Sequence, residues 1–130
     1  MSLKPMIVFV CEHGAAKSIF AVAYFNKMAQ QLGLDQQAIA RGTTPDQELS
    51  QKTLAGLLQD GLTPTEAKPQ NLSLQEIESA RRVIAFCELP EEYQPKAVVE
   101  RWEDVPPVSE NYENARDAII THLNHLVNNL

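Results

Sequence analysis

Apolar and polar positions follow one another along the chain in blocks that predict strands alternating with helices. Four short apolar runs have the length and the β-branched content of buried strands: residues 5–10, 38–41, 82–87 and 97–102. Between and after them, four longer segments place apolar residues at helical spacing: 18–33, 50–60, 73–80 and 112–127. The polar segment 63–71 holds two prolines, which favours a loop or a short edge strand, and 103–110 is expected to be a loop.

Two of these helices carry signals at their ends. Gly33 follows the last apolar position of the first helix and predicts its C-terminal stop. Ser73 stands three residues before Glu76, which is the spacing of a capping box at a helix N-terminus.

The alternation of strand and helix predicts the fold class. It favours right-handed crossovers, and therefore a single α/β domain over residues 1–130 in which a four-stranded parallel sheet has helices on both faces, a three-layer fold. Ligands of such sheets bind beyond the carboxyl ends of the strands. Cys11, Arg41 and Cys87 each stand at the end of a predicted strand, so we expect them on one edge of the sheet.

The composition and the net charge argue against some classes of function. The net charge of −6 argues against a nucleic-acid partner, and an anion site in such a protein must depend on local donors. No apolar run approaches the roughly 20 residues of a membrane span. Because the first predicted strand begins at residue 5, we expect no signal peptide. Two cysteines in an ordinary domain suggest a reducing compartment, so we expect a cytoplasmic protein, with no metal or cofactor.

The candidate reactive and anion-binding residues lie at the end of the first predicted strand. Cys11 is followed by a short loop containing Gly14, then by Lys17 and Ser18, where a helix begins. Backbone N–H groups at a helix N-terminus bind anions, and a cysteine beside them is favoured as a thiolate nucleophile. This order predicts an oxyanion site formed by the residues after the cysteine: Glu12, His13, Gly14, Ala15, Ala16 and Lys17.

Cys11 followed by five residues, a cation and Ser18 resembles the Cys-x5-Arg-Ser/Thr loop of the low-molecular-weight protein tyrosine phosphatases and the related thiol-coupled arsenate reductases. Further segments match that family in order: 40–43, 57–61, 69–72, 83–87 and 102–106. The chain departs from the family at four places. Lys17 replaces the loop arginine, Gly14 replaces an asparagine, Val105 interrupts the Asp-Pro pair, and Gln94 stands about where the reductases carry a second redox cysteine.

The resemblance implies roles for the central residues. Cys11 would attack the substrate, Ser18 would assist the thiolate, and Asp104, or Glu103 in its place, would protonate the leaving oxygen. Lys17 would bind the oxyanion as a point charge, without the fork of an arginine.

Four other side chains each allow two interpretations. Arg41 could supply a guanidinium to the oxyanion, or pair on the surface with Asp46 or Glu48. Cys87 could resolve a Cys11 intermediate as a redox thiol, or belong to the core. His13 could bond the thiolate or the oxyanion, or be solvated, and Glu12 could face the anion site or point outward.

These observations and the resemblance favour one function, the hydrolysis of phosphomonoesters of the phosphotyrosine type through a cysteinyl-phosphate. One alternative is arsenate reduction by Cys11 and Cys87 with an external thiol donor. The other is a non-catalytic protein that binds phosphate or a phosphorylated partner. The expected ligands are accordingly phosphate, arsenate or a phosphorylated substrate.

Overall fold

The computed structural model describes residues 6–93 and 99–130, and its centre is a parallel sheet. Its strands are β1 (Met6–Cys11), β2 (Gln37–Gly42), β3 (Arg82–Ala85) and β4 (Val99–Arg101). They lie in the order β2-β1-β3-β4, and every neighbouring pair is parallel. The predicted four-stranded parallel sheet is therefore confirmed. Within it, β1 is central, so the loop that follows Cys11 leaves the middle of the sheet.

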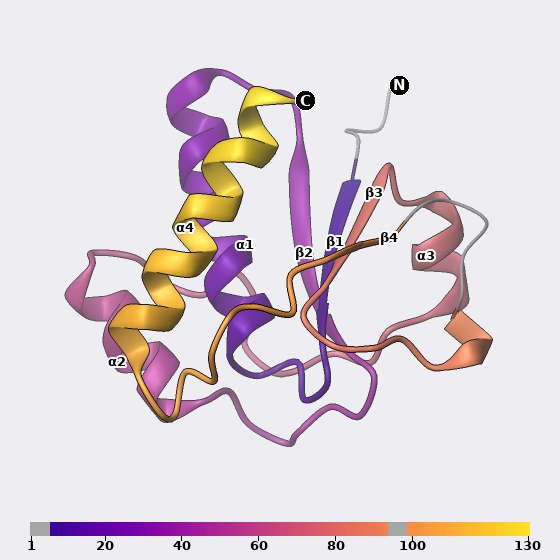
Figure 1. Cartoon of the computed structure of the whole chain (residues 1–130), viewed down its shortest axis with the longest axis horizontal. Coiled ribbons are helices and arrows are strands. Elements are labelled where there is room, and N and C mark those ends of the chain that lie inside the picture. Colours follow the sequence, from indigo (N-terminus) through magenta and orange to yellow (C-terminus); the bar gives the residue numbers. More distant parts are fainter. Residues whose placement is uncertain (1–5, 94–98) are drawn as a thin grey trace.

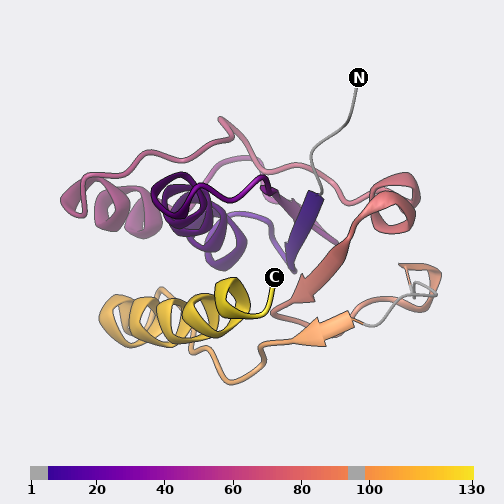
Figure 2. The ribbon, with the colours of Figure 1, turned by 90° about the horizontal axis from the view of Figure 1, so that it is seen from above.

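Helices cover both faces of this sheet, as expected. They are α1 (Lys17–Leu32), α2 (Gln51–Gln59), α3 (Leu74–Ser79) and α4 (Tyr112–Asn128). Figure 2 shows α1, α2 and α4 on one side of the strands and α3 on the other. The described chain also contains a 3-10 turn, η1 (Glu91–Tyr93), which was not predicted from the sequence. Within the described residues, no helix combines the length and the hydropathy needed to cross a membrane.

The alternation of side chains along β1 builds two cores. Ile7 and Phe9 pack with residues of α1 and α4, while Val8 and Val10 pack on the opposite face with Ile77 of α3. The four β1 side chains are completely buried. An apolar strand buried on both faces is typical of a central parallel strand, which explains why this run has no polar alternation.

The helix ends follow their sequence signals. Gly33 caps α1 in the left-handed conformation, with φ of 69°. Ser73 and Glu76 form both hydrogen bonds of a capping box at the start of α3. Observed boundaries differ from the predicted ones by a few residues. Four positions used in the sequence analysis lie outside the described residues: Pro5, Gln94, Ala97 and Val98.

A polar cluster joins the three helices of one face. Asp60, which caps α2, accepts hydrogen bonds from the hydroxyls of Tyr24 (2.6 Å) and Tyr112 (3.2 Å). Burial and this carboxylate raise the pKa of both tyrosines, so they remain donors. The ring of Tyr112 lies directly against Gly56, where a Cβ atom would come within 2.0 Å of it.

Candidate functional site

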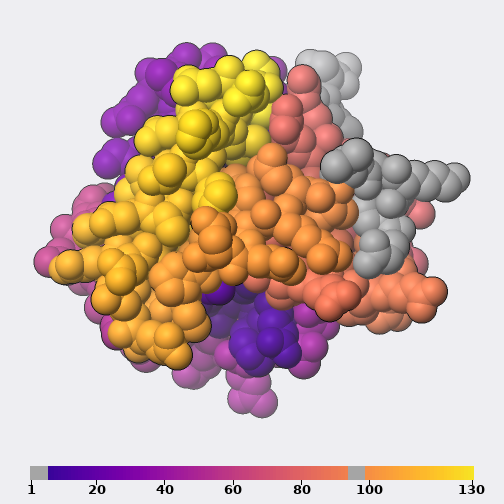
Figure 3. Space-filling model, viewed as in Figure 1, coloured from indigo at the N-terminus to yellow at the C-terminus, as the bar shows by residue number. Residues whose placement is uncertain are grey.

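The loop between β1 and α1 lies at the carboxyl edge of the sheet (Figure 1). In the space-filling view this indigo segment reaches the surface directly below the orange residues that precede α4 (Figure 3). Gly14 turns the loop with φ of 62°, a conformation that glycine adopts without steric cost. Its backbone also packs against Gly42 of β2, since a Cβ at Gly14 would lie 2.9 Å from the Gly42 nitrogen.

The carbonyl groups of this loop are turned toward the segment after β2. The carbonyls of Cys11, Glu12, His13 and Ala15 accept hydrogen bonds from the amides of Thr43 (3.2 Å), Thr44 (2.7 Å), Asp46 (3.0 Å) and Ser50 (2.9 Å). In a trans peptide the C=O and the following N–H point in opposite directions. The N–H groups of residues 12, 13, 14 and 16 therefore face away from this segment, which is the orientation that an oxyanion cradle needs.

The helix that follows begins without a side-chain cap. Ala16 occupies the N-cap position of α1 and has no side chain that could accept from the first N–H groups. At the end of β1, the Cys11 thiol lies 3.0 Å from the Ser18 hydroxyl, a hydrogen bond in which either atom can donate. Cys11 is only 7% exposed and Ser18 is fully buried. The thiol thus lies at the base of the loop, beside the uncapped helix end.

A pocket of about 330 Å³ opens above this thiol. The loop contributes Cys11, Glu12, His13, Ala16 and Lys17 to it. The opposite walls are Ser50, Phe86, Cys87, Pro107, Val108 and Ser109. The structure therefore brings together most of the loop residues expected from the sequence, along with Cys87. Ser50, Phe86 and residues 107–109 had no motif that could have marked them.

Lys17 reaches across the pocket to the loop that precedes α4. Its ammonium donates to the carbonyl oxygen of Val105 at 2.9 Å. Lys52 of α2 donates to the carbonyl of Ser109 in the same loop at 3.0 Å, but from an exposed position. Lys17 is accordingly a link between α1 and the pocket wall, in addition to any role toward an anion.

Asp104 does not line the pocket. Its carboxylate accepts from Nε2 of His122 of α4 at 2.8 Å, and its side chain is 67% exposed. This hydrogen bond holds the pKa of Asp104 below its usual value. The inserted Val105 is buried in the core, which leaves the preceding carboxylate outside. Glu103 also lies elsewhere, with its carboxylate 3.7 Å from Arg101.

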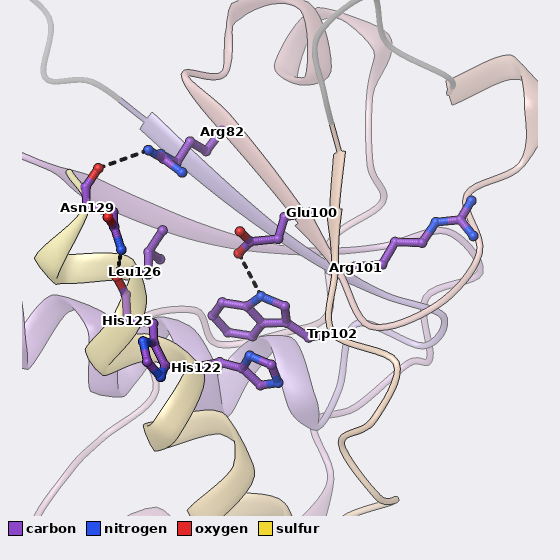
Figure 4. A pocket seen from close by; sticks show the side chains of 8 residues that line it. All are labelled: Arg82, Glu100, Arg101, Trp102, His122, His125, Leu126 and Asn129. Atoms are coloured by element: carbon purple, nitrogen blue, oxygen red, sulfur yellow. Dashed lines mark hydrogen bonds between the residues drawn. The ribbon is translucent and has the colours of Figure 1, made fainter.

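A second pocket, of about 490 Å³, lies between β4 and the C-terminal half of α4. Figure 4 shows the Trp102 indole there, donating to the Glu100 carboxylate at 2.7 Å. The His122 ring stacks on this indole with 4.6 Å between centroids. No residue predicted for the active site lines this pocket. In the described part of the chain, no cluster of three or more His, Cys, Asp or Glu side chains could hold a metal ion.

Arg41 is directed away from the pocket. Its guanidinium pairs with Glu66 and, at 2.8 Å, with Glu76 of α3. The register explains this placement: Arg41 lies beside Val10, whose side chain faces α3, whereas Cys11 is one position further along and faces the other way. Arg41 makes these two part-buried ion pairs in place of the expected oxyanion contact and the expected pairing with Asp46 or Glu48.

Asp46 instead holds His13 at the mouth of the pocket. Nδ1 of His13 lies 3.2 Å from the Asp46 carboxylate, and the His13 carbonyl accepts from the Asp46 amide at 3.0 Å. Nε2 of the same ring is 3.7 Å from the Glu12 carboxylate. His13 and Asp46 are far apart in the sequence, so no local pattern predicted this pair.

Cys87 shares the pocket with Cys11 but not its surroundings. Burial, followed by the nearby Cys11 and Glu12, raises the pKa of the Cys87 thiol to about 11. Both cysteines are free thiols. At neutral pH Cys87 is therefore a neutral thiol, while Cys11 has the hydrogen bond to Ser18 and the helix terminus beside it.

A buried thiol, loop amides that face away from the segment after β2 and a helix end without a side-chain cap lie together at one edge of an α/β fold. The sequence comparison assigns the family: residues 6–118 match the model of the low molecular weight phosphotyrosine protein phosphatases. The chain belongs to that family. The resemblance of the Cys11 loop to this family is thus confirmed.

Solved structures agree on the fold. YfkJ from Bacillus subtilis is 18% identical, with a TM-score of 0.86 over 98% of this chain and 95% of its own. A low molecular weight protein tyrosine phosphatase from T. tengcongensis is 18% identical, with a TM-score of 0.75 over 97% and 99%. An arsenate reductase from Archaeoglobus fulgidus is 21% identical, with a TM-score of 0.69 over 94% and 98%. No curated protein matches the sequence significantly.

Proposed function

We propose that this protein hydrolyses phosphomonoesters through a cysteinyl-phosphate on Cys11. The observation that carries the proposal is the position of the Cys11 thiol at the base of the pocket, bonded to Ser18 and adjacent to the uncapped N-terminus of α1. Loop N–H groups and the helix dipole stabilise both a thiolate and the equatorial oxygens of a transferring phosphoryl group.

The two steps use Cys11 and Lys17, which line the pocket, and Ser18, which bonds to the Cys11 thiol. The Cys11 thiolate attacks phosphorus in line, the bond from phosphorus to the ester oxygen breaks, and that oxygen leaves with the bonding electron pair and takes up a proton to become the alcohol. Water then attacks the phosphocysteine, and the thiolate is released again with the Ser18 hydroxyl donating to it. The ammonium of Lys17 adds positive charge beside the phosphoryl oxygens.

The pocket walls favour an aryl ester. Phe86, Pro107 and Val108 form an apolar lining opposite the polar loop. A phenyl ring placed there would be removed from water while its phosphate lay on the loop amides, and burial of apolar area gives about 25 cal/mol per Å². We therefore propose aryl phosphates, including phosphotyrosine, as the substrate class.

The test is turnover of p-nitrophenyl phosphate by the wild type, Cys11→Ser and Ser18→Ala. We expect activity in the wild type, none in Cys11→Ser, and a rate lowered about tenfold or more in Ser18→Ala, since removal of one hydrogen bond to a charged group costs roughly 1.5–3 kcal/mol. Cys87→Ser is the matched control, because this thiol lies in the same pocket and the proposal gives it no step. Activity that persists in Cys11→Ser contradicts the proposal.

Arsenate reduction is the second candidate, because Cys11 and Cys87 line one pocket. The reductase needs Cys87 to attack sulfur as a thiolate, and the raised pKa of Cys87 opposes that step at neutral pH. Arsenate and an external dithiol are added, and the protein is analysed by mass spectrometry. A Cys11–Cys87 disulfide or a mixed disulfide supports the reductase. Two free thiols favour the phosphatase, and phosphate binding without any turnover favours a binding protein.

A further inference from the structure

Hydrolysis of an unactivated ester needs a proton donor, and the described structure leaves the expected donors outside the pocket. Asp104 bonds to His122 of α4, does not line the pocket of Cys11, and stays ionised because this bond lowers the pKa of its carboxyl. Glu103 faces Arg101. A departing phenolate without a donor would carry a full negative charge, and positioned general acids typically contribute about 10²–10⁴-fold to such steps.

Few of the groups that line the pocket can donate this proton. The Cys11 thiol is the nucleophile, and the Lys17 ammonium already donates to the Val105 carbonyl. The Cys87 thiol has a pKa of about 11, which is far from neutrality. His13 and Glu12 remain, at the mouth of the pocket where a leaving group would depart.

His13 is the better placed of the two. The Asp46 carboxylate lies 3.2 Å from Nδ1 of the ring, at ion-pair distance between two exposed side chains, and the Asp46 amide bonds to the His13 carbonyl at 3.0 Å. Because Nδ1 faces Asp46, Nε2 is the ring nitrogen that we assign to the substrate. The nearest carboxylate oxygen to Nε2 is that of Glu12 at 3.7 Å, which is beyond hydrogen-bond distance. An imidazole oriented by a carboxylate is a common arrangement for proton transfer near neutral pH.

We propose that His13, oriented by Asp46, is the proton donor to the leaving oxygen, in the role expected from the sequence for Asp104. This inference rests on the proposed phosphatase function and specifies how it works. It also explains why the outward position of Asp104 need not prevent turnover.

The proton balance is complete in two steps. In the first, the sulfur electron pair forms the S–P bond, the P–O bond breaks, and the leaving oxygen takes the proton from Nε2 of His13. In the second, water attacks phosphorus, its proton passes to Nε2, and the S–P electron pair returns to Cys11. His13 and Cys11 regain their starting states, and the products are an alcohol and inorganic phosphate.

Leaving-group dependence provides the test, because a general acid matters only when the leaving group is a poor one. We compare kcat/KM for phenyl phosphate and for 2,4-dinitrophenyl phosphate in the wild type, His13→Gln, Glu12→Gln and Asp104→Asn. We expect His13→Gln to lose about 100-fold or more with phenyl phosphate and less than about 3-fold with the dinitrophenyl ester. Retained turnover of the activated ester shows that the pocket is intact. Asp104→Asn, whose carboxylate lies outside the pocket, should change both rates by less than about 3-fold.

A second variant separates positioning from donation. Asp46→Ala removes the carboxylate at Nδ1 but leaves the imidazole, so we expect a partial, leaving-group-dependent loss of about 10-fold with phenyl phosphate. If His13→Gln lowers both esters equally, or neither, the inference is overturned while the phosphatase stands. If Asp104→Asn or Glu12→Gln produces the selective loss, that carboxyl is the donor and His13 is not. If no variant, the wild type included, turns over the activated ester, the proposed function itself fails, and the inference with it.

Discussion

Replacing Lys17 by Met would remove the ammonium that joins α1 to the loop before α4 while keeping a side chain of similar length. The Val105 residue is buried, and its carbonyl would lose a charged donor at 2.9 Å. A hydrogen bond from a charged group is worth about 1.5–3 kcal/mol, and we take roughly 2 kcal/mol for this partly buried pair. For a domain of this length that corresponds to a Tm lowered by roughly 6–10 °C.

The assay is urea unfolding followed by fluorescence of Trp102, the single tryptophan of the chain, which lies where this loop begins. Lys52→Met is the matched control, because Lys52 donates to the Ser109 carbonyl of the same loop from an exposed position. We expect the control to cost less than about 0.5 kcal/mol. Equal small losses in both variants would refute the link. If Lys17→Met kept full stability and lost only phosphate binding, Lys17 would be an anion ligand alone.

Three further changes have defined outcomes. Lys17→Arg should raise kcat for aryl phosphates about tenfold, because a planar guanidinium can donate to the Val105 carbonyl and to the oxyanion together. An unchanged kcat in a steady-state assay would show that the loop is adapted to lysine. Gly56→Ala should destabilise the protein by roughly 1–3 kcal/mol in urea, since the new Cβ would overlap the Tyr112 ring, whereas the same change at an open helical site stabilises by about 1 kcal/mol. Asp104→Asn should lower stability at pH 7 by on the order of a few tenths of a kcal/mol, the scale of an exposed pair. The hydrogen bond from His122 lowers the pKa of Asp104 in the folded state. The difference in unfolding free energy between wild type and variant is therefore present above the ordinary Asp pKa of about 4 and is lost as the pH falls below it, which unfolding curves recorded over a pH series would show.

Local sequence patterns predicted most of the fold. The apolar run of β1 marked the central strand, Gly33 marked the end of α1, and the Ser73–Glu76 spacing marked the start of α3. Each of these signals acts between residues a few positions apart, so no knowledge of tertiary contacts was needed. The Cys11 loop was found for the same reason, because its strand, glycine and helix follow one another directly.

The placement of distant side chains could not be predicted in this way. The direction of Arg41 depends on the register between β1 and β2, and a shift of one residue would reverse the face to which it points. Asp104 faces outward because Val105 enters the core, and its partner His122 is 18 residues away. The pairing of His13 with Asp46 likewise arises only when the segments after β1 and β2 come together.

The central claim is that Cys11 carries the phosphoryl group during turnover. With 2,4-dinitrophenyl phosphate the leaving group departs readily, so hydrolysis of the phosphoenzyme becomes the slow step and the intermediate accumulates. The measurement is a rapid quench during turnover, followed by peptide mass spectrometry to locate the phosphoryl group. We predict one phosphoryl group on Cys11 in the wild type and none in Cys11→Ser. A phosphoryl group on another residue, or steady turnover with Cys11 unmodified, would contradict the account.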